Sequence, residues 1–192
     1  MAPTLPAAAL PDAITAAERI GWPVVLKTAA DVAHKSAAGG VQLGIAGAGM
    51  LAAAYAEMSR SLGPEVTVSA MVPPGAELAL GIARDPQFGP LVMAGAGGVL
   101  VELLADRVFG LPPLDETQAQ DMLARLRARR LLDGFRSTPA SNVAAVANAI
   151  VRLSALAADV GDLIGGLDIN PLIAGPSGCV AVDALVAHEP PG

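Results

Sequence analysis

The sequence predicts an α+β protein with two lobes that share a cleft. Strand and helix patterns are mixed along the chain, whereas a doubly wound sheet needs them to alternate. The segment Pro73-Pro74-Gly75 interrupts regular secondary structure and is the best candidate for a hinge between the lobes. No internal repeat is present, and 192 residues suffice for one ordinary domain or for two small lobes.

Before the hinge, hydrophobic periodicity predicts two helices and three strands. Residues 1–9 are rich in proline and alanine and are expected to be loose. The expected elements are helix Leu10–Ile20, strands Val24–Lys27 and Val41–Ile45, a helix over about Met50–Leu62, and strand Glu65–Val72.

After the hinge, strands and helices are again mixed. The glycine stretch Gly95–Gly98 joins two apolar segments and is expected to form a hairpin turn or a tight turn that faces an anion. Ser141 is the expected N-cap of the longest helix. The expected elements are strands Glu77–Arg84, Pro90–Ala94 and Val99–Leu104, helices Asp115–Leu126 and Ser141–Val160, and a hairpin of Leu167–Ala174 and Cys179–Val186.

Composition excludes several classes of function. A net charge of -6 and a pI near 4.8 give no general attraction to nucleic acid or anionic lipid. The single cysteine, Cys179, excludes an internal disulfide and favours a reducing, cytoplasmic setting. The longest apolar stretch, Leu91–Leu104, is interrupted and shorter than the ~20 residues of a membrane-spanning helix, so no span is expected.

The last hairpin places polar groups opposite one another. If Pro176 and Ser177 are the turn residues, counting outward puts Asn170 directly across from Asp183. Asp168 is two residues from Asn170 and faces the same side. One or two carboxylates with an amide oxygen suit Mg²⁺, which completes its shell with water and phosphate oxygens. The alternative is a solvated hairpin whose polar face has no ligand.

The segment Pro23–Leu43 combines a strand with a loop suited to phosphate. Lys27 ends the first strand, and His34 follows in a loop that also contains a second lysine and the pair Gly39-Gly40. Nearby cations favour a neutral imidazole, the nucleophilic form that accepts a phosphoryl group. The alternatives are a surface histidine, a lysine that extends to solvent and glycines that only form a turn.

Several motifs together resemble the ATP-grasp domain of NDP-forming acyl-CoA synthetases, the ADP-forming acetate–CoA ligases related to succinyl-CoA synthetase. The resemblance covers about Ile14 to Val186, and its most specific motifs are RDPQFGP and LDINPL. The motifs are Val24-Val25-Leu26-Lys27, His34-Lys35-Ser36 with Gly39-Gly40-Val41, Met71-Val72-Pro73 with Glu77-Leu78, Arg84 to Pro90, Leu167 to Leu172, and Val182-Asp183-Ala184.

The resemblance implies a two-lobed ATP-grasp fold with a shortened N-terminal lobe over 10–73 and a C-terminal lobe over 74–187. It implies that ATP or ADP binds with Mg²⁺ held by Asn170 and Asp183, and that His34 passes a phosphoryl group to ADP. The family reaction converts acyl-CoA, phosphate and ADP to acid, CoA and ATP, which requires a CoA-binding α-type subunit as partner. The implied nucleotide-binding residues are Lys27, Lys35, Ser36, Gly39, Gly40, Val72, Glu77 and Arg84.

Four positions depart from the family pattern. Ala37 stands where the family usually has Asp, Ala70 where it has Glu, Gly110 where it has Arg, and Gly166 where it has Glu. These substitutions favour a second hypothesis, a degenerate ATP-grasp module that contacts a partner without phosphoryl transfer.

Overall fold

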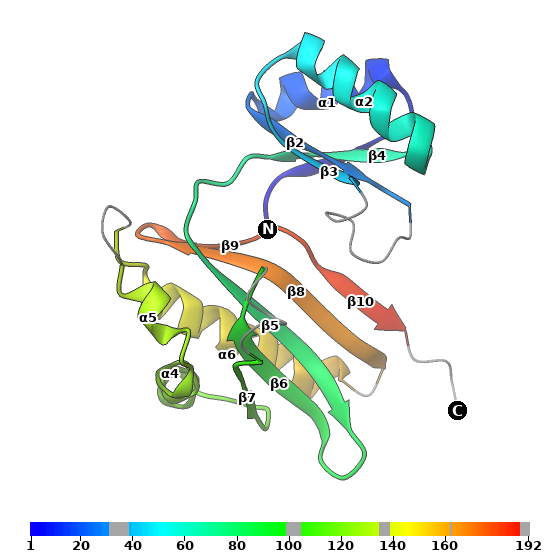
Figure 1. The fold of residues 1–192 in the computed structure, drawn as a ribbon. Coiled ribbons are helices and arrows are strands. Elements are labelled where there is room, and N and C mark those ends of the chain that lie inside the picture. The colour runs from blue at the N-terminus through cyan, green and yellow to red at the C-terminus, as the bar shows by residue number, and fades with distance from the viewer. Residues whose placement is uncertain (31–38, 99–104, 135–138, 162, 189–192) are drawn as a thin grey trace. The chain divides into compact units, whose positions relative to one another are not determined.

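The computed structural model divides into two compact units, residues 2–72 and residues 73–192 together with Met1 (Figure 1). It describes the chain except for residues 31–38, 99–104, 135–138, 162 and 189–192. The expected strand Val99–Leu104 therefore lies outside the described residues.

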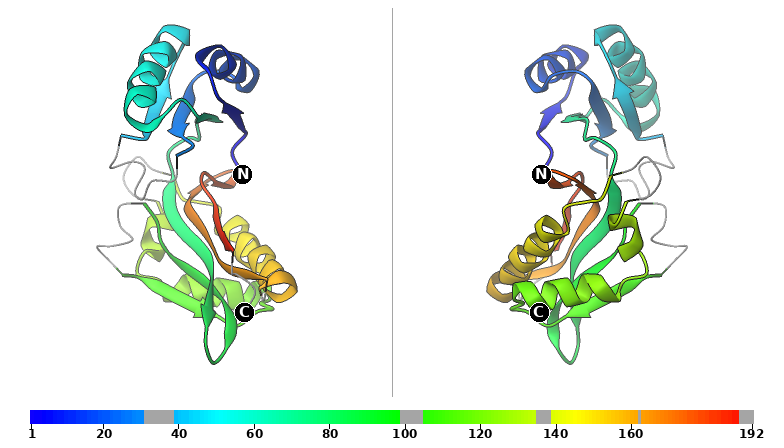
Figure 2. Two further views of the ribbon diagram at one scale, coloured as in Figure 1. Left: turned by 90° about the vertical axis from the view of Figure 1, so that its right-hand side faces the viewer. Right: turned by 90° about the vertical axis from the view of Figure 1, so that its left-hand side faces the viewer.

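The first unit is a four-stranded antiparallel sheet in the order β1-β4-β2-β3. Helices α1 and α2 lie together on one side of this sheet (Figure 2). Its core is aliphatic, as the low aromatic content requires, and includes Leu26, Leu51 and Val68. The elements are β1 (Thr4–Ala7), α1 (Leu10–Ile20), β2 (Val24–Thr28), β3 (Val41–Ile45), α2 (Ala48–Leu62) and β4 (Val66–Ala70).

The expectation that residues 1–9 are loose is wrong, because β1 pairs with β4 along the edge of the sheet. The hydroxyl groups of Thr4 and Ser69 are hydrogen-bonded at 2.9 Å, and Ala7 is buried. Pro6 is compatible with this position because an edge strand has one side without a partner. The strand is stabilised by tertiary pairing that local composition does not reveal.

The second unit is a six-stranded sheet in the order β10-β8-β5-β6-β7, with β9 also paired to β8. All pairings are antiparallel, and α6 packs against the sheet beside α4. The elements are β5 (Ala76–Asp85), β6 (Gly89–Ala96), β7 (Arg107–Gly110), α4 (Glu116–Arg125), α5 (Arg129–Leu132), α6 (Val143–Val160), β8 (Ile164–Gly175), β9 (Gly178–Ala181) and β10 (Leu185–His188).

The N-cap of the long helix α6 lies one residue later than expected. Asn142 is the N-cap, and its side-chain oxygen accepts a hydrogen bond from the backbone N–H of Ala145 at 3.0 Å. Ser141 instead donates from its hydroxyl to the carbonyl of Ala174 on β8. Two adjacent residues that both favour caps explain the error: the structure uses one to begin the helix and one to fix it to the sheet.

Within the described part of the chain, α6 is the one helix long and apolar enough to cross a membrane. Its buried residues include Val146, Ile150, Leu153 and Ala157, which belong to the core of the second unit. Packing against the sheet therefore accounts for the apolar character of α6.

Candidate nucleotide and metal site

The strand register confirms the predicted pairing of residues in the last hairpin. Gly175 pairs with Gly178 across the turn, and Leu172 pairs with Ala181. Beyond a break at residues 182–184, Asp168 pairs with Leu185 in the same register. The expected strand Cys179–Val186 is therefore two short strands, β9 and β10.

The break occurs at the proposed metal ligands. The N–H of Val182 still donates to the carbonyl of Pro171 at 3.0 Å. Because the register is the same on both sides of the break, Asn170 and Asp183 occupy opposed positions, as the sequence predicts.

Two carboxylates interact at this position. Partial burial raises the pKa of Asp168, and the nearby carboxylate of Asp183 raises it further. Asp168 is exposed as a whole residue but lines a cavity of about 190 Å³ together with Asn170, so its desolvation is partial. Two carboxylates this close repel each other, which destabilises the fold unless a cation binds to them. The pair is therefore suited to a metal ion.

The donor set fits Mg²⁺ better than a metal that needs a full protein shell. Within the described ranges, no group of three or more His, Cys, Asp or Glu side chains is placed to hold a metal ion. Two carboxylates and one amide are the sparse oxygen set that Mg²⁺ uses when phosphates and water complete its shell. One oxygen of Asp183 accepts from the N–H of Ala184 at 3.0 Å, which leaves the other oxygen for a ligand.

The glycine stretch joins this cluster from β6. The N–H of Gly98 donates to the side-chain oxygen of Asn170 at 3.0 Å, and the N–H of Gly97 donates to the carbonyl of Glu77 at 2.9 Å. A Cβ at Gly97 would overlap the backbone of Leu78, and one at Gly98 would overlap the carboxylate of Glu77. Only glycine allows this approach, which brings Glu77 and Asn170 together.

The signal for that contact was present in the sequence as a glycine pair after an apolar strand. The sequence predicts a hairpin turn or a tight turn that faces an anion over Gly95–Gly98. In the structure β6 runs through Gly95 and Ala96, and the second expected strand lies outside the described residues. The backbone N–H of Gly98 is thus a site contact that sequence reasoning missed.

The first unit places Lys27 on a central strand. Lys27 is half-buried on β2 and pairs with Val41 and Thr67 on the two neighbouring strands. Gly39 has a positive φ of 73°, and the carbonyl of Gly40 accepts from the N–H of Thr28 at 2.8 Å. The glycine pair therefore lies beside the end of β2, directly before β3.

Three site residues and one departure lie outside the described residues. These are His34, Lys35, Ser36 and Ala37.

Within the second unit, Arg84 lies outside the Asn170 cluster. Arg84 lies five residues along β5 from Ala79, which lines the Asn170 cavity, or about 16 Å at the rise of a strand. Its guanidinium donates to the carbonyl of Gly161 at the C-terminal end of α6, a position that favours a cation. Val72 is half-buried and ends the first unit after β4.

The other departures from the family pattern lie on strands. Ala70 ends β4, where its N–H donates to the carbonyl of Pro3 at 2.9 Å. Gly110 ends β7, and Met122 of α4 together with Leu114, which precedes α4, occupies the space that a Cβ would enter. Gly166 lies on β8 between Ala83 and Ala187.

The raised pKa of Asp168 gives a stability prediction. Because the folded pKa of this acid is higher than the unfolded one, its charge destabilises the fold as pH rises through the window above 3.8. Without Mg²⁺, Asp168→Asn should therefore have a higher Tm than the unaltered chain at pH 7, and the difference should vanish below pH ~3.8. Thermal unfolding across pH measures this. Glu57→Gln, which removes an exposed charge from the middle of α2, is the control, and the same gain in both would contradict the assignment.

A family model described as an ATP-grasp domain matches residues 1–187. The chain belongs to the ATP-grasp family. It is 36% identical over 182 residues to the beta subunit of acetate–CoA ligase [ADP-forming] I of Pyrococcus furiosus, covering 90% of this chain and 78% of that subunit. It is 39% identical over 176 residues to acetate–CoA ligase [ADP-forming] I of Archaeoglobus fulgidus, covering 87% of this chain and 25% of that ligase.

A solved structure shows the same fold. Acetyl-coenzyme A synthetase 1 of Ca. Korarchaeum cryptofilum, in complex with coenzyme A, Ca-AMPCP and HgCl+, superposes with a TM-score of 0.90 at 35% identity, covering 98% of this chain and 86% of that one. The same protein with Mg-AMPPCP has a TM-score of 0.85 at 37% identity, covering 97% and 84%, and has a phosphohistidine segment pointing towards the nucleotide binding site. The predicted ATP-grasp fold is confirmed.

Proposed function

We propose that this chain is the nucleotide-binding portion of an ADP-forming acyl-CoA synthetase in the cytoplasm. It passes a phosphoryl group through His34 to ADP and depends on a CoA-binding α-type partner for the rest of the reaction. The observation that supports this most is the unchanged register on both sides of residues 182–184, which sets Asn170 opposite Asp183 beside a second carboxylate. The relatives' activity and nucleotide complexes agree with it.

The residues of the second unit have distinct proposed roles. Asp183 and Asn170 hold Mg²⁺, which when bound neutralises charge on the nucleotide phosphates. The N–H of Gly98 fixes the amide of Asn170, so its second lone pair keeps a constant direction. Glu77 packs over Gly98 at the edge of the same cluster.

The first unit supplies the phosphate contacts. Lys27 is a point charge for phosphate, held by strand pairing on both sides. We propose that Lys35, Ser36, Gly39 and Gly40 bind the phosphates with it.

In the proposed phosphoryl transfer, His34 first accepts the phosphoryl group and then donates it. In its neutral form, one ring nitrogen attacks the phosphorus of a phosphohistidine on the partner, so that one P–N bond forms as another breaks. An oxygen of the ADP β-phosphate then attacks the same phosphorus and releases the histidine of this chain. Positioning and charge neutralisation supply most of the rate in such transfers.

Labelling with ATP tests the role of His34, because the reverse reaction places the terminal phosphoryl group on this histidine. With Mg²⁺ and γ-labelled ATP, the unaltered chain should carry label on histidine and His34→Asn should carry none. His188→Asn is the matched control, because the chain has only these two histidines. Equal labelling of His34→Asn and the unaltered chain would contradict the assignment of His34 as the phosphoryl acceptor.

The alternative function is a degenerate ATP-grasp module that binds a partner without phosphoryl transfer. It is favoured by Ala37, Ala70, Gly110 and Gly166, of which the last three occupy strand positions with no polar side chain. Calorimetry separates the two functions, since binding of Mg–ADP at micromolar to millimolar concentration supports the ligase role. No heat at millimolar ADP or ATP supports the module.

A further inference from the structure

One arginine lines the cavity that contains the proposed metal ligands of the second unit. The cavity has a volume of about 190 Å³, with Asp168 and Asn170 lining it from β8 and Arg107 lining it from β7. Among the described residues that line the cavity, Arg107 is the one with a positive charge. An anion bound there would therefore meet one side chain of opposite charge.

The strand register places Arg107 in line with Asn170. Arg107 pairs with Gly95 on β6, and Gly95 pairs with Ala79 on β5. Ala79 lies at the break in register between β5 and β8, opposite the part of β8 that contains Asn170. All four of these residues line the cavity, so their row lies on one face of the sheet.

Two small residues in the middle of this row separate its polar ends. Neighbouring strands lie about 4.8 Å apart, so the backbones of Arg107 and Asn170 are separated by three such intervals, or about 14 Å. Gly95 and Ala79 are buried and form the floor between them. A ligand above this floor would have the arginine on one side and the amide and carboxylates on the other.

The backbone beside Arg107 is held in place by hydrogen bonds. The carbonyl of Asp106 accepts from the N–H of Ala96 at 3.1 Å, and the carboxylate of Asp106 accepts from the N–H of Ala128 at 2.7 Å. A Cβ at Gly95 would lie 2.7 Å from the carbonyl of Asp106 and 3.4 Å from Cγ of Arg107. The stem of Arg107 therefore lies beside Gly95, where a larger side chain has no room.

The guanidinium of Arg107 has no ion pair with another side chain in the described part of the chain. Burial and the carboxylate of Asp183 raise the pKa of Asp168, so the acidic side of the cavity is not neutralised by the side chains around it. The cation and the carboxylates thus lie at one cavity without pairing. This arrangement suits a ligand that carries both signs of charge, such as a phosphate with its Mg²⁺.

We propose that Arg107 binds the terminal phosphate of the nucleotide, on the side opposite the Mg²⁺ that Asn170 and Asp183 are proposed to hold. The inference rests on the proposed function, and it adds one phosphate contact from the second unit to those of the first. A guanidinium presents its N–H donors in a planar fork that matches two phosphate oxygens. Metal and arginine together fix the phosphate from two sides, which orients its remaining oxygen for phosphoryl transfer.

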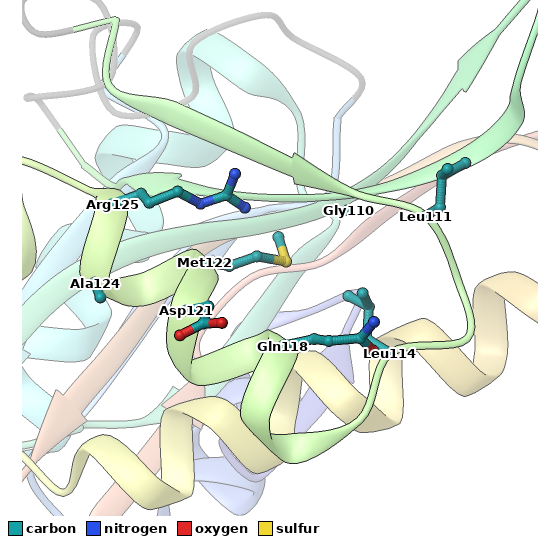
Figure 3. Close-up of a pocket in the computed structure, with 8 residues that line it drawn as sticks. All are labelled: Gly110, Leu111, Leu114, Gln118, Asp121, Met122, Ala124 and Arg125. Atoms are coloured by element: carbon teal, nitrogen blue, oxygen red, sulfur yellow. The ribbon is translucent and has the colours of Figure 1, made fainter.

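Arg125 is a matched control for Arg107, because it lines a different cavity. Figure 3 shows that cavity between β7 and α4, where Arg125 and Asp121 both lie on α4 and Gly110 lies at the end of β7. Gly110 is three residues after Arg107, and an odd spacing along a strand puts two residues on opposite faces of the sheet. Both arginines are exposed and belong to the second unit, so their substitution removes the same charge from different faces.

Calorimetric titration of the full chain with Mg–ADP tests the proposal. Arg107→Gln should lower the affinity at least tenfold, and Arg125→Gln should leave it unchanged. Arg107→Lys should lose less than Arg107→Gln, because an ammonium keeps the charge without the fork. Thermal unfolding confirms that the three variants fold. The proposal is overturned if Arg107→Gln binds Mg–ADP like the unaltered chain, or if Arg125→Gln loses as much, since net charge alone would then explain the effect.

Phosphorus NMR separates a direct phosphate contact from a general weakening of the site. At saturating Mg–ADP, the signal of the terminal phosphorus should differ between Arg107→Gln and the unaltered chain, whereas the signal of the α-phosphorus should be the same in both. Identical terminal signals overturn the proposal. A change confined to the α-phosphorus also overturns it, because the arginine would then contact the other phosphate.

Failure of this proposal is distinguishable from failure of the proposed function. If the unaltered chain and Arg107→Gln bind Mg–ADP with equal affinity, only the role of Arg107 is contradicted. If the unaltered chain binds no Mg–ADP, the ligase role is contradicted, and the inference that rests on it is contradicted with it.

Discussion

Asp183→Asn should lower the Mg²⁺-dependent affinity for ADP by on the order of 100-fold, or ~3 kcal/mol. The reason is that the donor set proposed among the described residues is sparse: the carboxylates of Asp168 and Asp183, and one amide oxygen that also accepts from Gly98. Removing a charge leaves a donor set too weak to hold Mg²⁺ beside phosphates. Calorimetric titration of ADP with Mg²⁺ and with EDTA measures the effect.

The control for this variant is Glu57→Gln, which removes an exposed charge on α2 in the first unit. It should leave ADP affinity unchanged. The difference between Asp183→Asn and the unaltered chain should disappear in EDTA, because the carboxylate acts through the metal. An Asp183→Asn variant that binds Mg–ADP normally would show that the metal assignment is wrong.

Gly97→Ala should destabilise the fold by about 3 kcal/mol, a cost in the upper range for overpacking. A Cβ at this position would lie 2.7 Å from the nitrogen of Leu78 and closer still to its carbonyl, so backbone must move. Two backbones packed against each other have no flexible side chain that could shift. Urea unfolding, with the midpoint and slope fitted together, measures the loss.

Gly175→Ala is the matched control, because its Cβ would meet nothing within 4 Å and its φ is not positive. It should change stability by less than ~0.5 kcal/mol. Gly97→Ala should also weaken Mg–ADP binding where the variant remains folded, since displacing Gly97 moves the N–H of Gly98 away from Asn170. Equal stability of the two variants would contradict the close approach.

Local patterns were sufficient for most elements of the fold. The helix over Leu10–Ile20 has the predicted bounds, because its apolar spacing and the glycine that ends it, Gly21, are both local signals. The opposition of Asn170 and Asp183 was also predictable, since a two-residue turn fixes the register of a hairpin. These predictions needed no knowledge of distant residues.

The errors have a different physical origin. Strand β1 contains Pro6 and short side chains, and it forms because Ser69 and its neighbours on β4 provide a partner. The hydrogen bond between Gly98 and Asn170 joins residues 72 positions apart. The contact of Arg84 with Gly161 joins residues 77 positions apart. Tertiary contacts of this kind are invisible to periodicity.

The turn between Gly175 and Gly178 determines which residues of the hairpin lie opposite one another, including Asn170 and Asp183. Each residue added to a strand reverses the side to which the following side chains point. A single inserted residue in this turn would move Asp183 out of line with Asn170 while every ligand kept its identity. The length of a surface turn, several residues away from the proposed metal ligands, is therefore under the same constraint as those residues themselves.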